Sequence, residues 1–99
     1  MGLSKFIKQP NGITLGYHRI VSIRIYTNIQ NTIEIESYIS YNMRIKEIDS
    51  LKNGITNDIY KIGNLITIPY DQNMTITTAY KYLKTLPEFE NAEDIFEDN

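Results

Sequence analysis

His18 is the one residue of this sequence whose side chain titrates near neutral pH, and it is the natural candidate for acid–base chemistry. A serine within hydrogen-bond reach would form a nucleophile–base pair, and Ser22 and Ser40 are the candidates. Neither serine follows a sequence resembling a nucleophile elbow. We therefore interpret His18 as a surface or interface residue of a strand that takes no part in catalysis.

Glu34 and Glu36 stand two residues apart, which places both carboxylates on one face of a strand. A carboxylate pair that acts as general acid and base also needs a cleft that separates the two pKa values. We interpret the pair as part of a solvated strand face with Arg24 and Arg44 nearby.

The sequence predicts no metal site and no cofactor site. There is no cysteine and a single histidine, which argues against a conventional structural zinc site. The stretch Asp71-Gln72-Asn73 lacks the alternating acidic ligands and the closing glutamate of a calcium loop, and no glycine-rich phosphate loop occurs. We therefore expect a protein that is not an enzyme, with no catalytic residues and no small-molecule substrate.

Charge is distributed unevenly along the 99 residues. Up to Pro87 there are ten Lys and Arg against six Asp and Glu, a balance of +4, and after Pro87 there are six acids and no base, a balance of −6. The basic residues are scattered, so we expect no nucleic-acid partner. No apolar run approaches the roughly 20 residues that span a bilayer, and the N-terminus lacks the apolar core of a signal peptide, so we expect no membrane association and no secretion by a signal peptide.

The main element that positions these residues is a predicted β-hairpin. Apolar and polar side chains alternate along residues 17–46, which indicates two long strands with a turn near Asn28-Ile29-Gln30-Asn31. On the second arm the odd positions form a mostly apolar face: Ile33, Ile35, Ser37, Ile39, Tyr41, Met43 and Ile45. On the first arm strict alternation places Tyr17, Arg19, Val21, Ile23 and Ile25 on one face and His18, Ile20, Ser22, Arg24 and Tyr26 on the other.

The second face of this hairpin is not cleanly polar, and we interpret it as a candidate contact surface. We expect Ile29 to be exposed at the tip, where a partner subunit could use it. The candidate interface residues are His18, Ile20, Tyr26, Ile29 and Tyr38. The alternative is that helices or the N-terminal hairpin cover this face.

Three further strand or turn signals flank the long hairpin. Residues 4–16 predict a smaller hairpin, whose turn Gln9-Pro10-Asn11-Gly12 suits a type I turn with a glycine bulge. Residues 46–58 predict a connection with a short helical turn at 46–51. Residues 60–70 predict a strand with a bulge at Gly63-Asn64, and Pro69 places its end at a sheet edge.

The C-terminal part changes to a helical period, with apolar residues at positions 76, 79, 80 and 83 and Thr75 as the N-cap. Pro87 begins a second short helix, on which Phe89, Ala92 and Phe96 dock against the domain. We therefore predict a single domain over residues 1–99, mainly β over 4–70 and helical over 75–96, with an acidic tail. The fold class is α+β, an antiparallel sheet of about four to six strands built on the long hairpin, with one or two short C-terminal helices packed on one face.

Three stretches resemble a known group of proteins: NGITLGYHRI at 11–20, IESYIS at 35–40 and TAYKYLKTLPEF at 78–89. They are similar to small proteins encoded in the tail and baseplate gene modules of tailed bacteriophages and prophages. The resemblance implies a virion structural or assembly protein, a tail or baseplate component that contacts other phage structural proteins or itself as a homo-oligomer. It also implies a place in the virion after assembly in the host cytoplasm.

Two other hypotheses stay open. The first is a small intracellular prophage-encoded module that docks on a host protein through its acidic tail. The second is a hydrolase, which would require a pocket around His18 with a serine or a carboxylate in hydrogen-bond reach.

Overall fold

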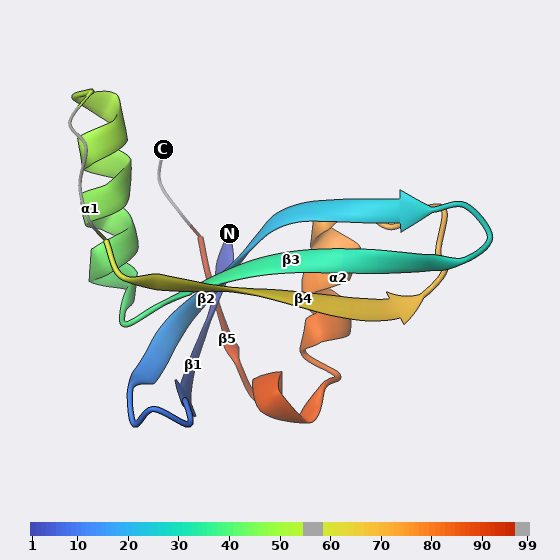
Figure 1. Cartoon of the computed structure of the whole chain (residues 1–99), viewed down its shortest axis with the longest axis horizontal. Helices are drawn as coiled ribbons and strands as arrows, with labels where there is room; N and C mark the ends of the chain where they lie inside the picture. The colour runs from blue at the N-terminus through green and yellow to red at the C-terminus, as the bar shows by residue number, and fades with distance from the viewer. Residues whose placement is uncertain (55–58, 97–99) are drawn as a thin grey trace.

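The computed structural model describes residues 1–54 and 59–96, which form an α+β domain around a five-stranded antiparallel sheet (Figure 1). The elements are β1 (Gly2–Lys8), β2 (Thr14–Tyr26), β3 (Gln30–Tyr38), α1 (Tyr41–Lys52), β4 (Lys61–Pro69), α2 (Ile76–Leu83), the 3₁₀ turn η1 (Pro87–Phe89) and β5 (Glu93–Ile95). The strand order is β4-β3-β2-β1-β5. This architecture confirms the predicted fold class.

The N-terminal hairpin has the predicted turn. The Gln9 N–H donates to the Ile13 carbonyl at 2.7 Å, and the Ile13 N–H donates to the Asn11 side-chain oxygen at 3.0 Å. Gly12 has φ +89°, a conformation that costs glycine little because it has no Cβ. The turn therefore fixes how β1 and β2 pair.

A bulge at Val21 divides β2 into two halves with opposite alternation. Ile20 pairs with Ile35 and Ser22 pairs with Glu34, so Val21 has no residue opposite it in β3. The strict alternation that we predicted along the first arm is therefore wrong. The residues of β2 that share the inner face with odd positions of β3 are His18, Ile20, Ile23 and Ile25, and those of the outer face are Tyr17, Arg19, Ser22, Arg24 and Tyr26.

The long hairpin is shorter than predicted. β3 ends at Tyr38, and residues 41–46, which we assigned to the end of its second arm, belong to α1. Ser40 is the N-cap of α1, and the helix continues to Lys52 instead of forming only a short turn. Its Met, Arg, Lys and Glu residues have good helix propensity, which outweighs the alternation that happens to continue there. The end of the predicted connection, residues 55–58, lies outside the described residues.

β4 is an edge strand, as Pro69 indicated, and its pairing with β3 is unbroken from Lys61 to Pro69. The bulge that we predicted at Gly63-Asn64 is therefore wrong. A glycine in a strand does not by itself require a bulge when the pairing partner Glu36 stays in register.

The core lies between the inner face of the sheet and α2, which crosses behind β2, β3 and β4 in Figure 1. Thr75 caps α2 as predicted, and Thr78 completes a reciprocal capping box with it. The buried core residues are Leu3, Ile20, Ile33, Ile35, Ile68, Ala79, Tyr80, Leu83, Phe89 and Ala92.

The C-terminal segment is not a second α-helix. After η1 the chain forms β5, which pairs with β1 so that Gly2 lies opposite Ile95. Phe89 and Ala92 are buried as predicted, whereas Phe96 is 73% exposed, so its predicted docking is wrong. Backbone pairing with the free edge of β1 outweighs helix formation in so short a segment. Part of the predicted acidic tail is thus built into the sheet, and residues 97–99 lie outside the described residues.

Candidate functional site

The predicted interface residues do not share one surface. Tyr26 and Ile29 are exposed at the far end of the β2–β3 hairpin, with Ile29 73% exposed at the tip as expected. His18, Ile20 and Tyr38 are buried within the chain, which corrects their assignment to an exposed face. The bulge at Val21 sends His18 and Ile20 to the inner face, while α1 and its polar contacts cover Tyr38 on the outer face.

His18 forms a buried hydrogen-bonded chain that links three strands. Its Nε2 lies 2.8 Å from the carbonyl oxygen of Lys5, which can only accept, so we assign the proton to Nε2. Nδ1, 2.7 Å from the Ser37 hydroxyl oxygen, is then the acceptor and Ser37 the donor. Burial lowers the pKa of His18 below its ordinary value, although the hydrogen bond with Lys5 opposes this shift. The imidazole is therefore neutral near pH 7 and is placed to accept the serine proton.

A cavity of about 300 Å³ lies beside this His18–Ser37 pair. Phe89 lines it and meets the His18 ring edge-on, with the ring centroids 5.2 Å apart. Asn64 and Glu88 add polar groups to its wall. The arrangement meets the geometric requirement stated for the hydrolase hypothesis, with Ser37 in the place for which Ser22 and Ser40 were considered. The cross-strand register places Ser37 opposite His18, and serines chosen from their own sequence surroundings miss this pairing.

The two glutamates of β3 make separate contacts rather than a catalytic pair. Glu34 accepts a hydrogen bond from Ser22 at 3.3 Å. Glu36 forms ion pairs with Arg19 at 3.2 Å and with Lys61 at 2.9 Å. The cations paired with Glu36 are therefore Arg19 and Lys61. Of the two arginines expected nearby, Arg24 lines the same hollow as Glu34, whereas Arg44 pairs with Glu47 of α1.

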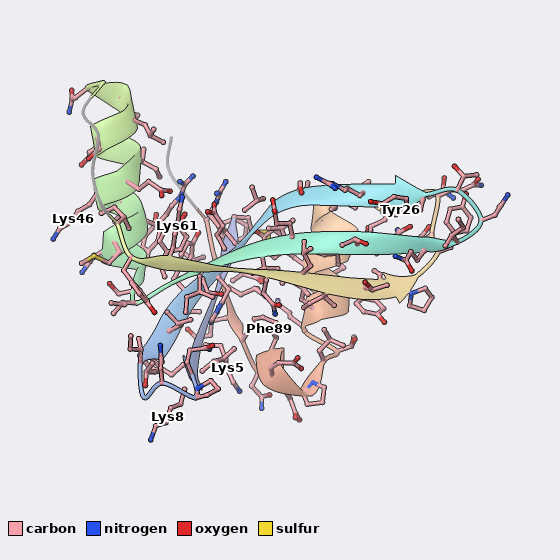
Figure 2. All side chains as sticks on the ribbon, in the orientation of Figure 1. Lys5, Lys8, Tyr26, Lys46, Lys61 and Phe89 are labelled. Carbon is pink, nitrogen blue, oxygen red and sulfur yellow. The ribbon has the colours of Figure 1, made fainter. Side chains whose placement is uncertain are left out.

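A polar network fixes the base of α1 on the sheet. Glu47 of α1 accepts from the Tyr38 hydroxyl at 2.7 Å and from Lys61 Nζ at 2.9 Å, and it also pairs with Arg44. Figure 2 shows Lys61 at this end of the sheet and Tyr26 at the opposite end. The network therefore ties α1, β3 and β4 together at one point.

The network also shifts the ionisation of its members. Burial raises the pKa of Glu47, but hydrogen bonds from Lys61, Tyr38 and Arg44 outweigh that effect and hold the pKa below its ordinary value. Burial, together with the hydrogen bond to Glu47, raises the pKa of Tyr38 to about 12. The hydrogen bonds to Glu47 and Glu36 raise the pKa of Lys61. All three groups therefore keep their usual charge states near neutral pH.

Beyond this anchor, α1 and β4 expose apolar side chains. Leu51 near the end of α1 is 71% exposed, and Ile45, nearer the start of the helix, is also exposed. On β4, Leu65 is 63% exposed beside a shallow hollow of about 300 Å³ on the outer sheet face, which Arg24, Tyr26 and Glu34 also line. Exposed apolar side chains of this kind are suited to contact with another protein rather than to catalysis.

Within residues 1–54 and 59–96 there is no group of three or more His, Asp or Glu side chains placed to hold a metal ion. Among the same residues, no helix has both the length and the apolar character needed to cross a bilayer.

Comparison with known proteins adds no relative: no family model, curated protein or solved structure matches this chain.

Proposed function

We propose that this chain is a structural or assembly protein of a tailed bacteriophage or prophage virion, a tail or baseplate component that acts through protein–protein contacts. The observation that supports it best is the projection of α1. In Figure 1 the helix stands away from the sheet, and its outer end exposes Leu51. The network around Glu47 ties the N-terminal part of the helix to the sheet.

A helix that is attached through one part and exposes the apolar side chain of Leu51 near its other end is suited to insertion against a neighbouring subunit. The attachment limits the conformational entropy lost on binding, and the uncovered apolar side chains gain from burial. The resemblance of residues 11–20, 35–40 and 78–89 to tail-module proteins supports the same role.

The direct test is to induce particle release in the host that encodes this chain and to identify virion proteins by mass spectrometry. We expect peptides of this chain in purified particles, or in a stable complex with products of the neighbouring morphogenesis genes. Its absence from both would contradict the proposal and favour an intracellular module that docks on a host protein.

A pair of variants tests the contribution of α1. Leu51→Glu places a charge in the proposed contact and should lower incorporation into particles. Asn42→Glu, at an exposed position in the first turn of the same helix, should leave incorporation unchanged. Equal incorporation of both variants would remove α1 as the contact element.

One specific contact favours a second candidate function, a serine hydrolase built on the His18–Ser37 pair. In such a reaction Ser37 Oγ would add to a carbonyl carbon, the electrons of the C=O π bond would move to the carbonyl oxygen, and the serine proton would pass to His18 Nδ1. As the tetrahedral intermediate collapses, His18 would give that proton to the departing group. Incubation with a fluorophosphonate probe, followed by intact-mass measurement, tests it. Labelling that Ser37→Ala abolishes and Ser40→Ala leaves intact would support the hydrolase, and the absence of labelling would dispose of it.

A further inference from the structure

β4 presents a complete, regular sheet edge. It is the last strand on its side of the sheet, and all nine of its residues are in continuous register with β3. Alternate residues of such a strand direct their N–H and C=O groups away from the sheet. The opposite edge is divided between β5, which has three residues and pairs with Gly2 to Ser4, and the rest of β1, which carries Lys5 and Lys8. β4 is thus the long edge of the described sheet.

The features by which proteins usually block an exposed edge are absent from the middle of β4. Its residues pair without a bulge. Its single charged residue, Lys61, is engaged by Glu36 and Glu47 at 2.9 Å each and so is held on its own sheet. Pro69, which cannot donate a hydrogen bond, is the final residue and affects only the end of the strand.

We propose that β4 pairs antiparallel with β4 of a second copy of this chain, across a two-fold axis at Leu65, to form a continuous ten-stranded sheet. This rests on the proposed structural role, of which it would be the first assembly step. Leu65 is the middle residue of Lys61–Pro69, so this register pairs the whole strand with itself.

The self-pairing brings apolar side chains together and sets no like charges opposite each other. The Leu65 side chain, 63% exposed in the single chain, meets Leu65 of the second copy on the outer sheet face. Lys61 lies opposite Pro69 of the second copy, about 26 Å along the strand from the other Lys61 at 3.3 Å per residue. No like charges face each other, because β4 contains no other ionisable residue. A second copy suits this edge because a two-fold axis uses the same strand of both chains over its full length, and Lys61, the single charge of each strand, is already held on its own sheet.

The first measurement is the molar mass of the full chain in solution by light scattering over a concentration series. We expect a dimer. Leu65→Lys sets two like charges against each other at the axis and should raise the dimer dissociation constant by about tenfold or more. Ile29→Lys, the same kind of change at the exposed tip of the β2–β3 hairpin, should not. Circular dichroism of both variants checks that the fold is kept.

Cross-linking tests the register, and it is free of background because the chain has no cysteine. Leu65→Cys should form an intermolecular disulfide under mild oxidation, since residues at the axis face each other directly. Thr67→Cys is the matched control on the same exposed face of β4. Its two thiols would lie about 13 Å apart along the strand and should not bridge.

A monomer at all concentrations, a dimer insensitive to Leu65→Lys, or equal cross-linking of the two cysteine variants would overturn the proposed pairing. This failure is distinguishable from failure of the structural role. If the chain is found in virions but does not cross-link at Leu65, the structural role is supported and the β4 pairing is refuted. If the chain cross-links at Leu65 as a dimer but is absent from particles and from morphogenesis complexes, the β4 pairing is supported and the structural role is refuted.

Discussion

The hydroxyl of Tyr80 on α2 accepts a hydrogen bond of 2.8 Å from the backbone N–H of Ile20, the residue directly before the bulge. The same hydroxyl donates to the carbonyl oxygen of Met1 at 2.6 Å. A side chain from the helix thereby satisfies a backbone donor of β2 beside the interruption of the β2–β3 pairing, and it ties the start of the chain to the core.

Tyr80→Phe should lower the free energy of unfolding by about 1–2 kcal/mol, because it leaves a buried backbone donor and an acceptor without this partner. Urea unfolding followed by circular dichroism measures the change. Tyr82→Phe on the same helix is the control, and we expect it to change stability by less than about 0.5 kcal/mol. Equal effects of the two changes would show that the hydroxyl of Tyr80 contributes nothing specific.

The pH dependence of stability should report the burial of His18, whose pKa lies below its ordinary value in the folded chain. In the unfolded chain the imidazole takes up a proton as pH falls through about 6.5, whereas the folded chain does so only at lower pH. Stability should therefore fall as pH decreases below about 6.5, by up to about 1.4 kcal/mol per pH unit from this group.

His18→Gln should remove that part of the slope, which begins as pH falls below about 6.5. His18 is the only histidine, so the difference between the two curves isolates its contribution. Glu47, whose pKa is lowered, contributes a separate loss that begins at more acidic pH. Parallel curves for the two proteins would show that His18 titrates alike in the folded and unfolded chains.

Glu47→Gln should loosen the attachment of α1, because it removes the carboxylate that Tyr38, Arg44 and Lys61 share. We expect a loss of about 1–2 kcal/mol, less than a fully buried pair would give since Lys61 is partly exposed. Asp49→Asn, an exposed acid-to-amide change on the same helix, is the control and should be close to neutral. Urea unfolding compares the two, and equal stabilities would contradict an anchoring role.

Gly12→Ala should destabilise the N-terminal hairpin by about 1 kcal/mol, because Gly12 has φ +89°. The added methyl group meets no atom within 4 Å, so the effect would come from the backbone conformation alone. Gly63→Ala is the control, with open space around the methyl group and no left-handed backbone. We expect that change to be neutral or slightly stabilising, as thermal unfolding of both variants would reveal.

Local signals in the sequence predicted the turn at Asn11-Gly12, the Thr75 cap, the exposed tip at Ile29 and the edge position of β4. Each depends on residues that act on their immediate neighbours, such as a preset φ or a side-chain cap. The class of fold followed from these elements and from the two hydrophobic periods, and it was predicted in full.

The bulge at Val21 escaped prediction because nothing in Val21 itself marks it. The apolar positions Ile20, Ile23 and Ile25 are spaced three and then two apart, and only pairing with β3 turns that spacing into a bulge. This one displaced residue moved His18 and Ile20 from the predicted contact face into the interior. The Ser37 contact was missed for the same reason, since a cross-strand neighbour depends on register rather than on adjacent sequence.

The start of α1 was missed because two patterns coincide. Tyr41, Met43 and Ile45 continue the alternation of β3, while the residues between and after them are good helix formers. Alternation alone cannot choose between a longer strand and a helix that leaves the sheet. The paired residues of β2 and β3 end at Tyr38. One more hydrogen bond follows, from the Gly16 N–H to the Ile39 carbonyl at 3.1 Å, and from Tyr41 the chain is helical.

The pairing of β1 with β5 has a consequence for the order of events in folding. Leu3 lies opposite Asp94, so β1 gains this neighbour only after the other strands and α2 have been synthesised. A growing chain can form the β1–β2 and β2–β3 hairpins early, but β1 remains an open edge until residues 93–95 have emerged. The nascent protein therefore passes through a stage with both sides of its sheet unprotected, when association with other chains or a chaperone is most favourable.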